Sequence, residues 1–199
     1  MAKVKYFSFD LQGVLSASGF SDYFWLEQLP LLYANKHGVA LQQAKTELRT
    51  QFAAMGKYDT RYYDDAFWAR QLGFKTAEVL RGMPLQPSRN ETLFEFIRAQ
   101  PLPVVIISTT TRVFLNYELG DKKPLFEQIY SCVDTFGIGG KTPAVYQKVA
   151  QELGVQPDEI LHIGDDPEMD VRNACAAGVR ALAYDANDAD LIKILRSLS

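Results

Sequence analysis

Short apolar runs of strand length alternate with amphipathic stretches along most of the chain. The apolar runs cover Val4–Phe9, Pro103–Ile107, Ile160–Ile163 and Val179–Tyr184, and a weaker run covers Tyr130–Asp134. Apolar runs of this length predict buried strands, and helical patterns between them predict the crossovers of a parallel sheet. We therefore expect an α/β fold with a Rossmann-like parallel sheet.

Four helical patterns follow or separate these runs. They lie at Glu91–Gln100, Pro143–Gly154, Met169–Val179 and 188–198. The second pattern has proline near its first position and glycine at its end, which are the residues that helix starts and ends prefer. Each helix is expected to pack an apolar face against the sheet.

Residues 16–85 break the alternation, because their pattern is helical and aromatic with few β-branched runs. A connector that contains glycine and proline, Arg81–Glu91, leads back to the alternating pattern. We therefore expect two parts. Residues 1–15 and 86–199 form the core, and residues 16–85 form a helical insertion after the first strand.

Composition narrows the range of partners and locations. Hydrophobic residues make up 47% of the chain and charged residues 23%, as in globular proteins. The net charge is −3 and no basic block accompanies the aromatic residues, so no nucleic-acid partner is expected. The chain shows no signal-peptide pattern and no apolar run of membrane-spanning length, so we expect a cytoplasmic protein without a membrane partner. Cys132 and Cys175 stand far apart and are expected to be reduced thiols.

Polar side chains gather where the predicted strands end, which is where open parallel sheets bind ligands. Those side chains belong to Asp10, Ser108, Lys141, Asp165, Asp166 and Asp170. Carboxylate oxygens suit Mg²⁺, which takes hard oxygen ligands. An ammonium and a hydroxyl can hold a phosphoryl group, and an aspartate can attack phosphorus as a nucleophile. The set favours phosphate chemistry assisted by magnesium.

Four stretches resemble the motifs of the haloacid dehalogenase-like hydrolase superfamily, in the order found in that family. They are FDLQGVL, VVIIST, GKTPAVYQKVAQELGV and ILHIGDDPEMDVRNACAAGV. The resemblance implies a phosphatase that acts on a small phosphorylated metabolite through an aspartyl-phosphate, with Mg²⁺ as cofactor, as a monomer or homodimer. The interval from Asp10 to Ser108 is far longer than a crossover needs, so the insertion corresponds to a helical cap that follows the first motif.

The resemblance also implies roles for the residues that hold the phosphoryl group. Asp10 is the nucleophile. Ser108, Lys141 and backbone amides near Gly13 and Thr109 bind the phosphoryl oxygens.

A second set of roles concerns the metal. Asp10, the backbone carbonyl of Gln12 and Asp165 are the implied ligands of Mg²⁺. Of the neighbouring pair, one carboxylate is expected to bind the metal and the other, Asp166, to cap the following helix. Asp170 is expected to pair with Lys141.

Gln12 departs from the family pattern. The phosphatases carry an aspartate there that protonates the leaving group and then activates water. An amide cannot exchange protons near neutral pH, and losing such help costs on the order of 10²–10⁴ in rate. Two functions therefore stay open: a slow enzyme, and a non-catalytic sensor that binds a phosphorylated metabolite. Asp64 and Asp65 are candidates for a replacement acid.

Other readings of the same residues are weaker. Phospho-receiver domains use similar groups, but their acidic pair follows the first strand and they lack a helical insertion. Dehalogenating relatives lack the metal carboxylates, so Asp165 and Asp166 favour phosphate over halide. His162 lies within an apolar run and is expected to be a packed core histidine, and Arg112 is as consistent with a helix surface as with substrate contact.

Overall fold

The computed structural model describes residues 2–186 and 190–198. Within these residues, five parallel strands form one sheet in the order β3-β2-β1-β4-β5. The strands are β1 (Tyr6–Phe9), β2 (Val104–Ser108), β3 (Gln128–Ser131), β4 (Ile160–Gly164) and β5 (Arg180–Ala183). The α/β class predicted from the sequence is confirmed.

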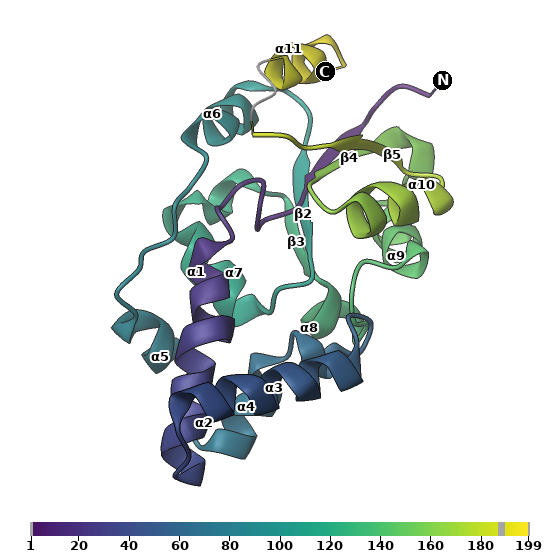
Figure 1. Ribbon diagram of the computed structural model, residues 1–199. Helices are drawn as coiled ribbons and strands as arrows, with labels where there is room; N and C mark the ends of the chain where they lie inside the picture. Colours follow the sequence, from purple (N-terminus) through teal and green to yellow (C-terminus); the bar gives the residue numbers. More distant parts are fainter. Residues whose placement is uncertain (1, 187–189, 199) are drawn as a thin grey trace.

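Two pairs of helices cover the sheet: α6 (Glu91–Ala99) with α11 (Leu191–Ser197), and α9 (Pro143–Leu153) with α10 (Asn173–Ala176). Val104 and Ile106 of β2 pack into the apolar cluster that contains α6 and α11, whereas Val105 and Ile107 pack into the cluster that contains α9 and α10. Successive side chains of a strand point to opposite faces. An unbroken apolar run therefore fits a sheet that is covered on both sides (Figure 1).

The stretch between β1 and β2 is helical, as its pattern predicts, and we call residues 19–82 the helical segment. Its elements are α1 (Gly19–Tyr23), a π-helical turn (Phe24–Gln28), α2 (Leu29–His37), α3 (Leu41–Met55), a 3₁₀ turn (Thr60–Tyr62), α4 (Asp65–Leu72) and α5 (Thr76–Gly82). Leu29, Leu48, Trp68 and Leu72 form a small core of its own. Figure 1 shows α2, α3 and α4 gathered below the sheet.

The helical segment is fastened to the helix that follows β2, α7 (Arg112–Leu119). Phe20, Phe24 and Leu80 pack against Phe114 of α7. Nearer the sheet, the backbone of Tyr58 lies so close to Gly139 that a Cβ atom on Gly139 would come within 2.4 Å of the Tyr58 carbonyl oxygen. Only glycine permits this approach, so the segment fits tightly over the loop that precedes α9.

Two sequence predictions need correction. The weak apolar run at Tyr130–Asp134 is a strand only as far as Ser131, because the Ser131 hydroxyl accepts the Asp134 N–H and begins helix α8 (Cys132–Phe136). The helix expected over Met169–Val179 is divided into a π-helical turn (Pro167–Arg172) and α10. The start of the predicted C-terminal helix lies outside the described residues.

The strand order defines a switch point next to β1. The chain leaves β1 for β2 and β3 on one side, and β4 and β5 then add on the other side. Phe9 is paired with both Ile106 and Ile163, so Asp10 emerges between the loops after β2 and β4. Ligands of open α/β sheets bind at the carboxyl ends of the strands at such a point.

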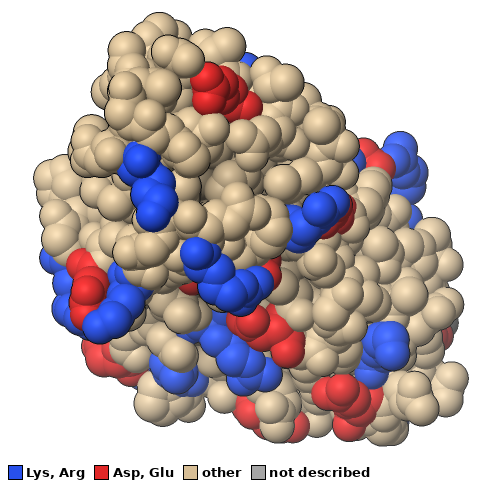
Figure 2. All heavy atoms as spheres, turned by 90° about the horizontal axis from the view of Figure 1, so that it is seen from below, with Lys and Arg blue, Asp and Glu red and all other residues tan. Residues whose placement is uncertain are grey.

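The described helices include none that is both long enough and apolar enough to cross a membrane. Cys132 and Cys175 are free thiols, as expected. Figure 2 shows the lower face of the molecule, where basic and acidic side chains are mixed instead of forming one basic block.

Candidate active site

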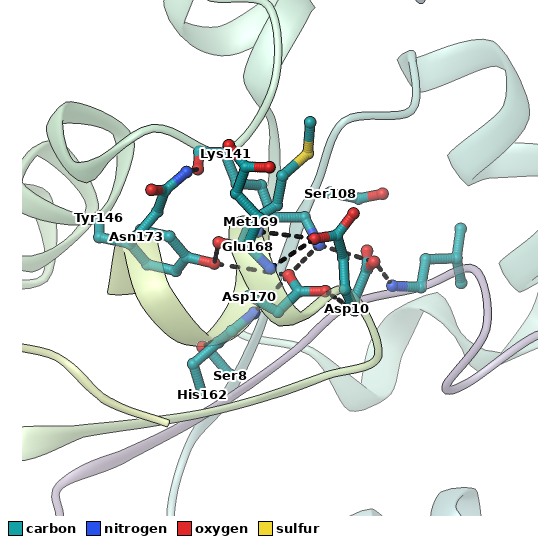
Figure 3. A network of polar contacts seen from close by, with 12 residues as sticks. Ser8, Asp10, Ser108, Lys141, Tyr146, His162, Glu168, Met169, Asp170 and Asn173 are labelled. Carbon is teal, nitrogen blue, oxygen red and sulfur yellow. Dashed lines mark hydrogen bonds and ion pairs between the residues drawn. The ribbon is translucent and has the colours of Figure 1, made fainter. Parts of the chain in front are cut away.

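A buried ammonium, that of Lys141, lies between two carboxylates at the carboxyl ends of β1 and β4 (Figure 3). Its Nζ is 2.6 Å from Asp10 Oδ2 and also contacts Asp170 Oδ1. Lys141 is 1% exposed and Asp170 is fully buried. Burial opposes the charged ammonium, but the two carboxylates outweigh it and raise the pKa of Lys141. The pairing of Lys141 with Asp170 that the sequence predicts is present.

Asp170 is held from several sides. Besides Lys141, it accepts hydrogen bonds from His162 Nε2 at 3.0 Å and from the backbone N–H of Asp166 at 3.0 Å. Because the carboxylate takes the ring N–H, His162 Nδ1 accepts from the Ser8 hydroxyl at 2.6 Å. Burial alone would raise the pKa of Asp170, but Lys141 and His162 outweigh it and lower the pKa.

His162 is fully buried, as predicted for a core histidine. Burial lowers its pKa, which keeps the ring neutral. Sequence reasoning missed its contact with Asp170. The available signal was Ser8, a polar residue inside an apolar strand and on the same face as Asp10.

Asp10 follows directly after β1, and its Oδ1 accepts the N–H of Leu11 at 2.7 Å. Burial raises the pKa of the Asp10 carboxyl to about 7, against the opposing effect of Lys141, and the carboxylates of Asp170 and Asp165 add to the rise. The Asp10 side chain is 12% exposed. The site therefore holds more carboxylates than its one buried ammonium neutralises.

This excess of oxygen ligands fits a hard divalent cation. Asp10, Asp165 and Asp170 each offer an oxygen, and these atoms lie within 4.8 Å of one another. Among the described residues, none donates a backbone hydrogen bond to the Gln12 carbonyl. Gly13 has φ +84°, and a Cβ there would fall 2.1 Å from Asp165 Oδ2. The cluster of carboxylate oxygens could therefore hold a divalent cation, and the Gln12 carbonyl is a further oxygen nearby in the chain.

The remaining predicted residues lie around this cluster. Ser108 ends β2 and is 1% exposed, and its Oγ accepts the N–H of Thr110 at 3.3 Å. Asp166 caps the following turn, since its Oδ1 accepts the N–H groups of Glu168 and Met169 at 2.7 and 2.8 Å. Of the neighbouring pair, Asp166 is thus the helix cap, as expected. Asp165 offers one of the three clustered carboxylate oxygens.

A cavity of about 530 Å³ opens between the helical segment and the loops after β1 and β2. Gln12 and the stretch 109–111 line its sheet side, and aromatic rings of the helical segment line the opposite side. Volumes of this size are typical of small-molecule sites. The expected phosphate-binding loop at Thr109 is therefore part of the cavity wall.

Sequence reasoning missed a second buried carboxylate, Glu118 of α7. Gln12 Nε2 donates to Glu118 Oε1 at 2.7 Å, and the Ser16 hydroxyl donates to Oε2 at 2.7 Å. Glu118 is fully buried, and burial raises its pKa to about 7 against the effect of these two hydrogen bonds. The sequence indicated Glu118 only weakly, because it is a single glutamate in RVFLNYEL. No helix was predicted for that stretch.

Three candidates lie away from the reacting position. The Asp64 carboxylate caps α4 by accepting the Ala66 N–H at 2.9 Å, and the buried Asp65 carboxylate accepts the Thr111 hydroxyl. Neither aspartate is among the residues that line the cavity. Arg112 is exposed, with its guanidinium 3.3 Å from the hydroxyl of Thr135.

Comparison with known proteins identifies the family. Residues 4–178 match the sequence model of the haloacid dehalogenase-like hydrolases, and the chain belongs to that family. The GMP/IMP nucleotidase YrfG of Escherichia coli is 24% identical over 175 residues, which cover 86% of this chain and 78% of the nucleotidase. An enolase-phosphatase of Aquifex aeolicus is 33% identical over 116 residues, which cover 55% of this chain and 48% of that enzyme.

Solved structures agree with this fold. The crystal structure of a phosphatase of the same superfamily from Thermococcus onnurineus superposes with a TM-score of 0.80 at 18% identity, covering 98% of both chains. A 2-haloacid dehalogenase from Pseudomonas syringae superposes with a TM-score of 0.63 at 20% identity, covering 98% of this chain and 97% of the dehalogenase. The chain is thus a hydrolase-class α/β protein of the haloacid dehalogenase-like family.

Proposed function

We propose that this protein is a Mg²⁺-dependent hydrolase of a small phosphorylated metabolite, with the helical segment as its cap. The observation that carries the proposal is the grouping of Asp10, Lys141 and Asp165 at the switch point of the sheet, beside a cavity of small-molecule size. The names of the nucleotidase and the enolase-phosphatase support a phosphate ester as substrate.

In the proposed reaction, an Oδ atom of Asp10 attacks phosphorus, the bond to the leaving oxygen breaks, and an aspartyl-phosphate forms. Water then attacks the phosphorus, the bond to Asp10 breaks, and inorganic phosphate leaves. Lys141, Ser108 and the backbone amides near Gly13 and Thr109 hold the phosphoryl oxygens. When bound by Asp10, the Gln12 carbonyl and Asp165, Mg²⁺ neutralises charge on those oxygens.

Gln12 sets a limit on this reaction. Its amide cannot give a proton to the leaving oxygen or take one from water. Substrates whose leaving groups depart without a proton, such as acetyl phosphate and aryl phosphates, are therefore expected to react fastest. Because the second step also lacks a base, the aspartyl-phosphate is expected to accumulate.

The test is Mg²⁺-dependent phosphate release from a panel of phosphate esters that includes GMP and IMP. EDTA should abolish release and Mg²⁺ should restore it, and Asp165→Asn should weaken the response to Mg²⁺ strongly. Asp158→Asn is the matched control, since Asp158 is exposed in the turn before β4. Full activity in EDTA would contradict the metal assignment.

Gln12 also favours a second candidate function, a sensor that binds the phosphorylated metabolite without turnover. Tight binding measured by calorimetry, with no phosphate released from any ester of the panel, would support the sensor and reject the hydrolase.

A further inference from the structure

The cavity beside Gln12 has an unusual wall. Five aromatic rings line it, four from the helical segment and one from α7: Trp25, Phe52, Tyr62, Tyr63 and Phe114. They form a continuous set, because Trp25 stacks on Phe114 at 6.0 Å between ring centroids and Phe52 meets Trp25 and Tyr62 edge to face at 6.0 and 5.3 Å. We propose that this aromatic wall receives the leaving group of the substrate, and that the leaving group carries a flat aromatic ring. The inference rests on the proposed function.

The position of the cavity makes it a leaving-group site. Gln12 and Thr109, which border the proposed phosphoryl site, line the same cavity as the aromatic rings. A phosphate ester whose phosphorus faces Asp10 would extend its leaving group in that direction. Rings pack on flat partners in stacked or edge-to-face contact and gain more than buried area alone provides.

The polar groups of the cavity argue against a sugar. The Lys45 ammonium is already bound to the Glu27 carboxylate at 2.6 Å, the Gln12 amide to Glu118, and the Thr111 hydroxyl to Asp65. A sugar buried against the rings would lose water from hydroxyls all around its rim and regain hydrogen bonds for only some of them, which is costly. A flat ring has few polar edges, and Asp22 and Arg49 in the lining can meet these.

The experiment compares benzyl phosphate with cyclohexylmethyl phosphate. Both leave as primary alcohols of similar size, and they differ in whether the ring is flat. We expect a lower KM for benzyl phosphate. Phe52→Leu should raise that KM about threefold to tenfold, as expected for the loss of an aromatic contact, and should narrow the difference between the two esters.

Phe67→Leu is the matched control, because Phe67 packs against the same small core but does not line the cavity. Equal KM values for the two esters, or equal effects of Phe52→Leu and Phe67→Leu, would overturn the inference while leaving the hydrolase intact. If no ester and no acetyl phosphate is turned over, the proposed function fails. The calorimetric affinities of the same two esters then decide the ring preference.

A second inference stands on a different observation, the buried contact between Gln12 and Glu118. Glu118 takes the NH₂ group of Gln12, so the Gln12 carbonyl oxygen Oε1 is directed elsewhere. No described residue donates to Oε1, and the described chain has no buried side-chain oxygen without a partner, so Oε1 is open to the cavity that Gln12 lines. We infer that Glu118 is a positioning residue: it fixes the Gln12 amide so that Oε1 accepts a hydrogen bond from the attacking water.

This role does not depend on the charge of Glu118. An ionised carboxylate accepts from both Gln12 and Ser16. A neutral carboxyl can donate to the Ser16 oxygen and still accept from Gln12, because a hydroxyl can reverse its role and an NH₂ group cannot. A glutamine can orient water for attack on phosphorus without taking a proton. The inference rests on the proposed function, whose second step supplies the water.

The test measures decay of the phosphorylated protein after loading with acetyl phosphate. Glu118→Leu should slow the decay on the order of tenfold, the scale of one lost hydrogen bond. Glu118→Gln should restore it, since its amide can accept from Gln12 and donate to Ser16. Ser16→Ala removes the other hydrogen bond and is the control for packing.

A double-mutant cycle separates positioning from a general structural effect. In a Gln12→Ala background, Glu118→Leu should cause no further slowing, because the group it positions is gone. Slowing of equal size in both backgrounds, or wild-type decay in Glu118→Leu, would overturn this inference alone. Absence of any phosphorylated protein would overturn it together with the proposed function.

Discussion

Two fully buried carboxylates, Asp170 and Glu118, contact residues of the candidate active site and are held in opposite ways. Asp170 contacts the Lys141 ammonium and the His162 N–H, and its pKa is lowered. Among the described residues, the Glu118 carboxylate accepts from an amide and a hydroxyl, and its pKa is raised to about 7. Burial disfavours the ionised form of both carboxylates, so their hydrogen-bond and ion-pair partners decide which one stays ionised. One part of the site is thus an ion pair, and the other, which we call the neutral side because both partners of Glu118 are uncharged, is a hydrogen-bonded cluster.

Removing the Lys141 ammonium should have the largest effect on this contrast. Lys141→Met leaves Asp10 and Asp170 buried without their shared ammonium, and breaking a buried ion pair costs about 3–5 kcal/mol of the free energy of unfolding. Urea denaturation should show this loss, and phosphate release should disappear. Lys148→Met, on the exposed side of α9, is the control. Similar losses in the two variants would mean that the ion pair does not dominate the stability of this site.

Restoring a carboxylate at position 12 should give the neutral side a proton-transfer group. Gln12→Asp is expected to raise steady turnover on the order of 10²–10⁴-fold and to remove the burst of aspartyl-phosphate. It also sets a second carboxylate against Glu118, so the gain should be larger when Glu118→Gln accompanies it. Rapid-quench kinetics and intact mass measure the adduct, which Asp10→Asn should abolish. Unchanged turnover in both variants would show that position 12 is not limiting.

The raised pKa of Glu118 should be visible in stability. The group titrates near 4.5 when unfolded and about 7 when folded, so the native state holds its proton across that window. The free energy of unfolding should therefore fall as pH rises from about 4.5 to 7 and then level off, with a contribution on the order of 3 kcal/mol. Glu118→Gln should flatten this part of the profile in EDTA-treated protein. Superimposable profiles of variant and wild type would mean that Glu118 is not neutral.

The sequence predicted the ion-paired side of the site far better than the neutral side. Asp10, Lys141 and Asp170 follow strands or precede a helix in recognisable motifs, and parallel strands bring such ends together. Glu118 acts through tertiary packing of α7 against the loop after β1, which no local pattern encodes. The position of Asp65 was left open for the same reason, since only the fold shows that its carboxylate lies against Thr111.

The central place of β1 in the sheet has a consequence for how the chain folds. β1 precedes the other strands of its sheet, yet both of its partners, β2 and β4, lie far along the chain beyond the helical segment. Contacts between such distant residues form slowly, because a long loop must close before they contribute. Until those contacts form, the apolar strand β1 has no paired neighbours, which favours aggregation. The helical segment, whose small core forms from nearby residues, is therefore expected to fold before the sheet that it covers.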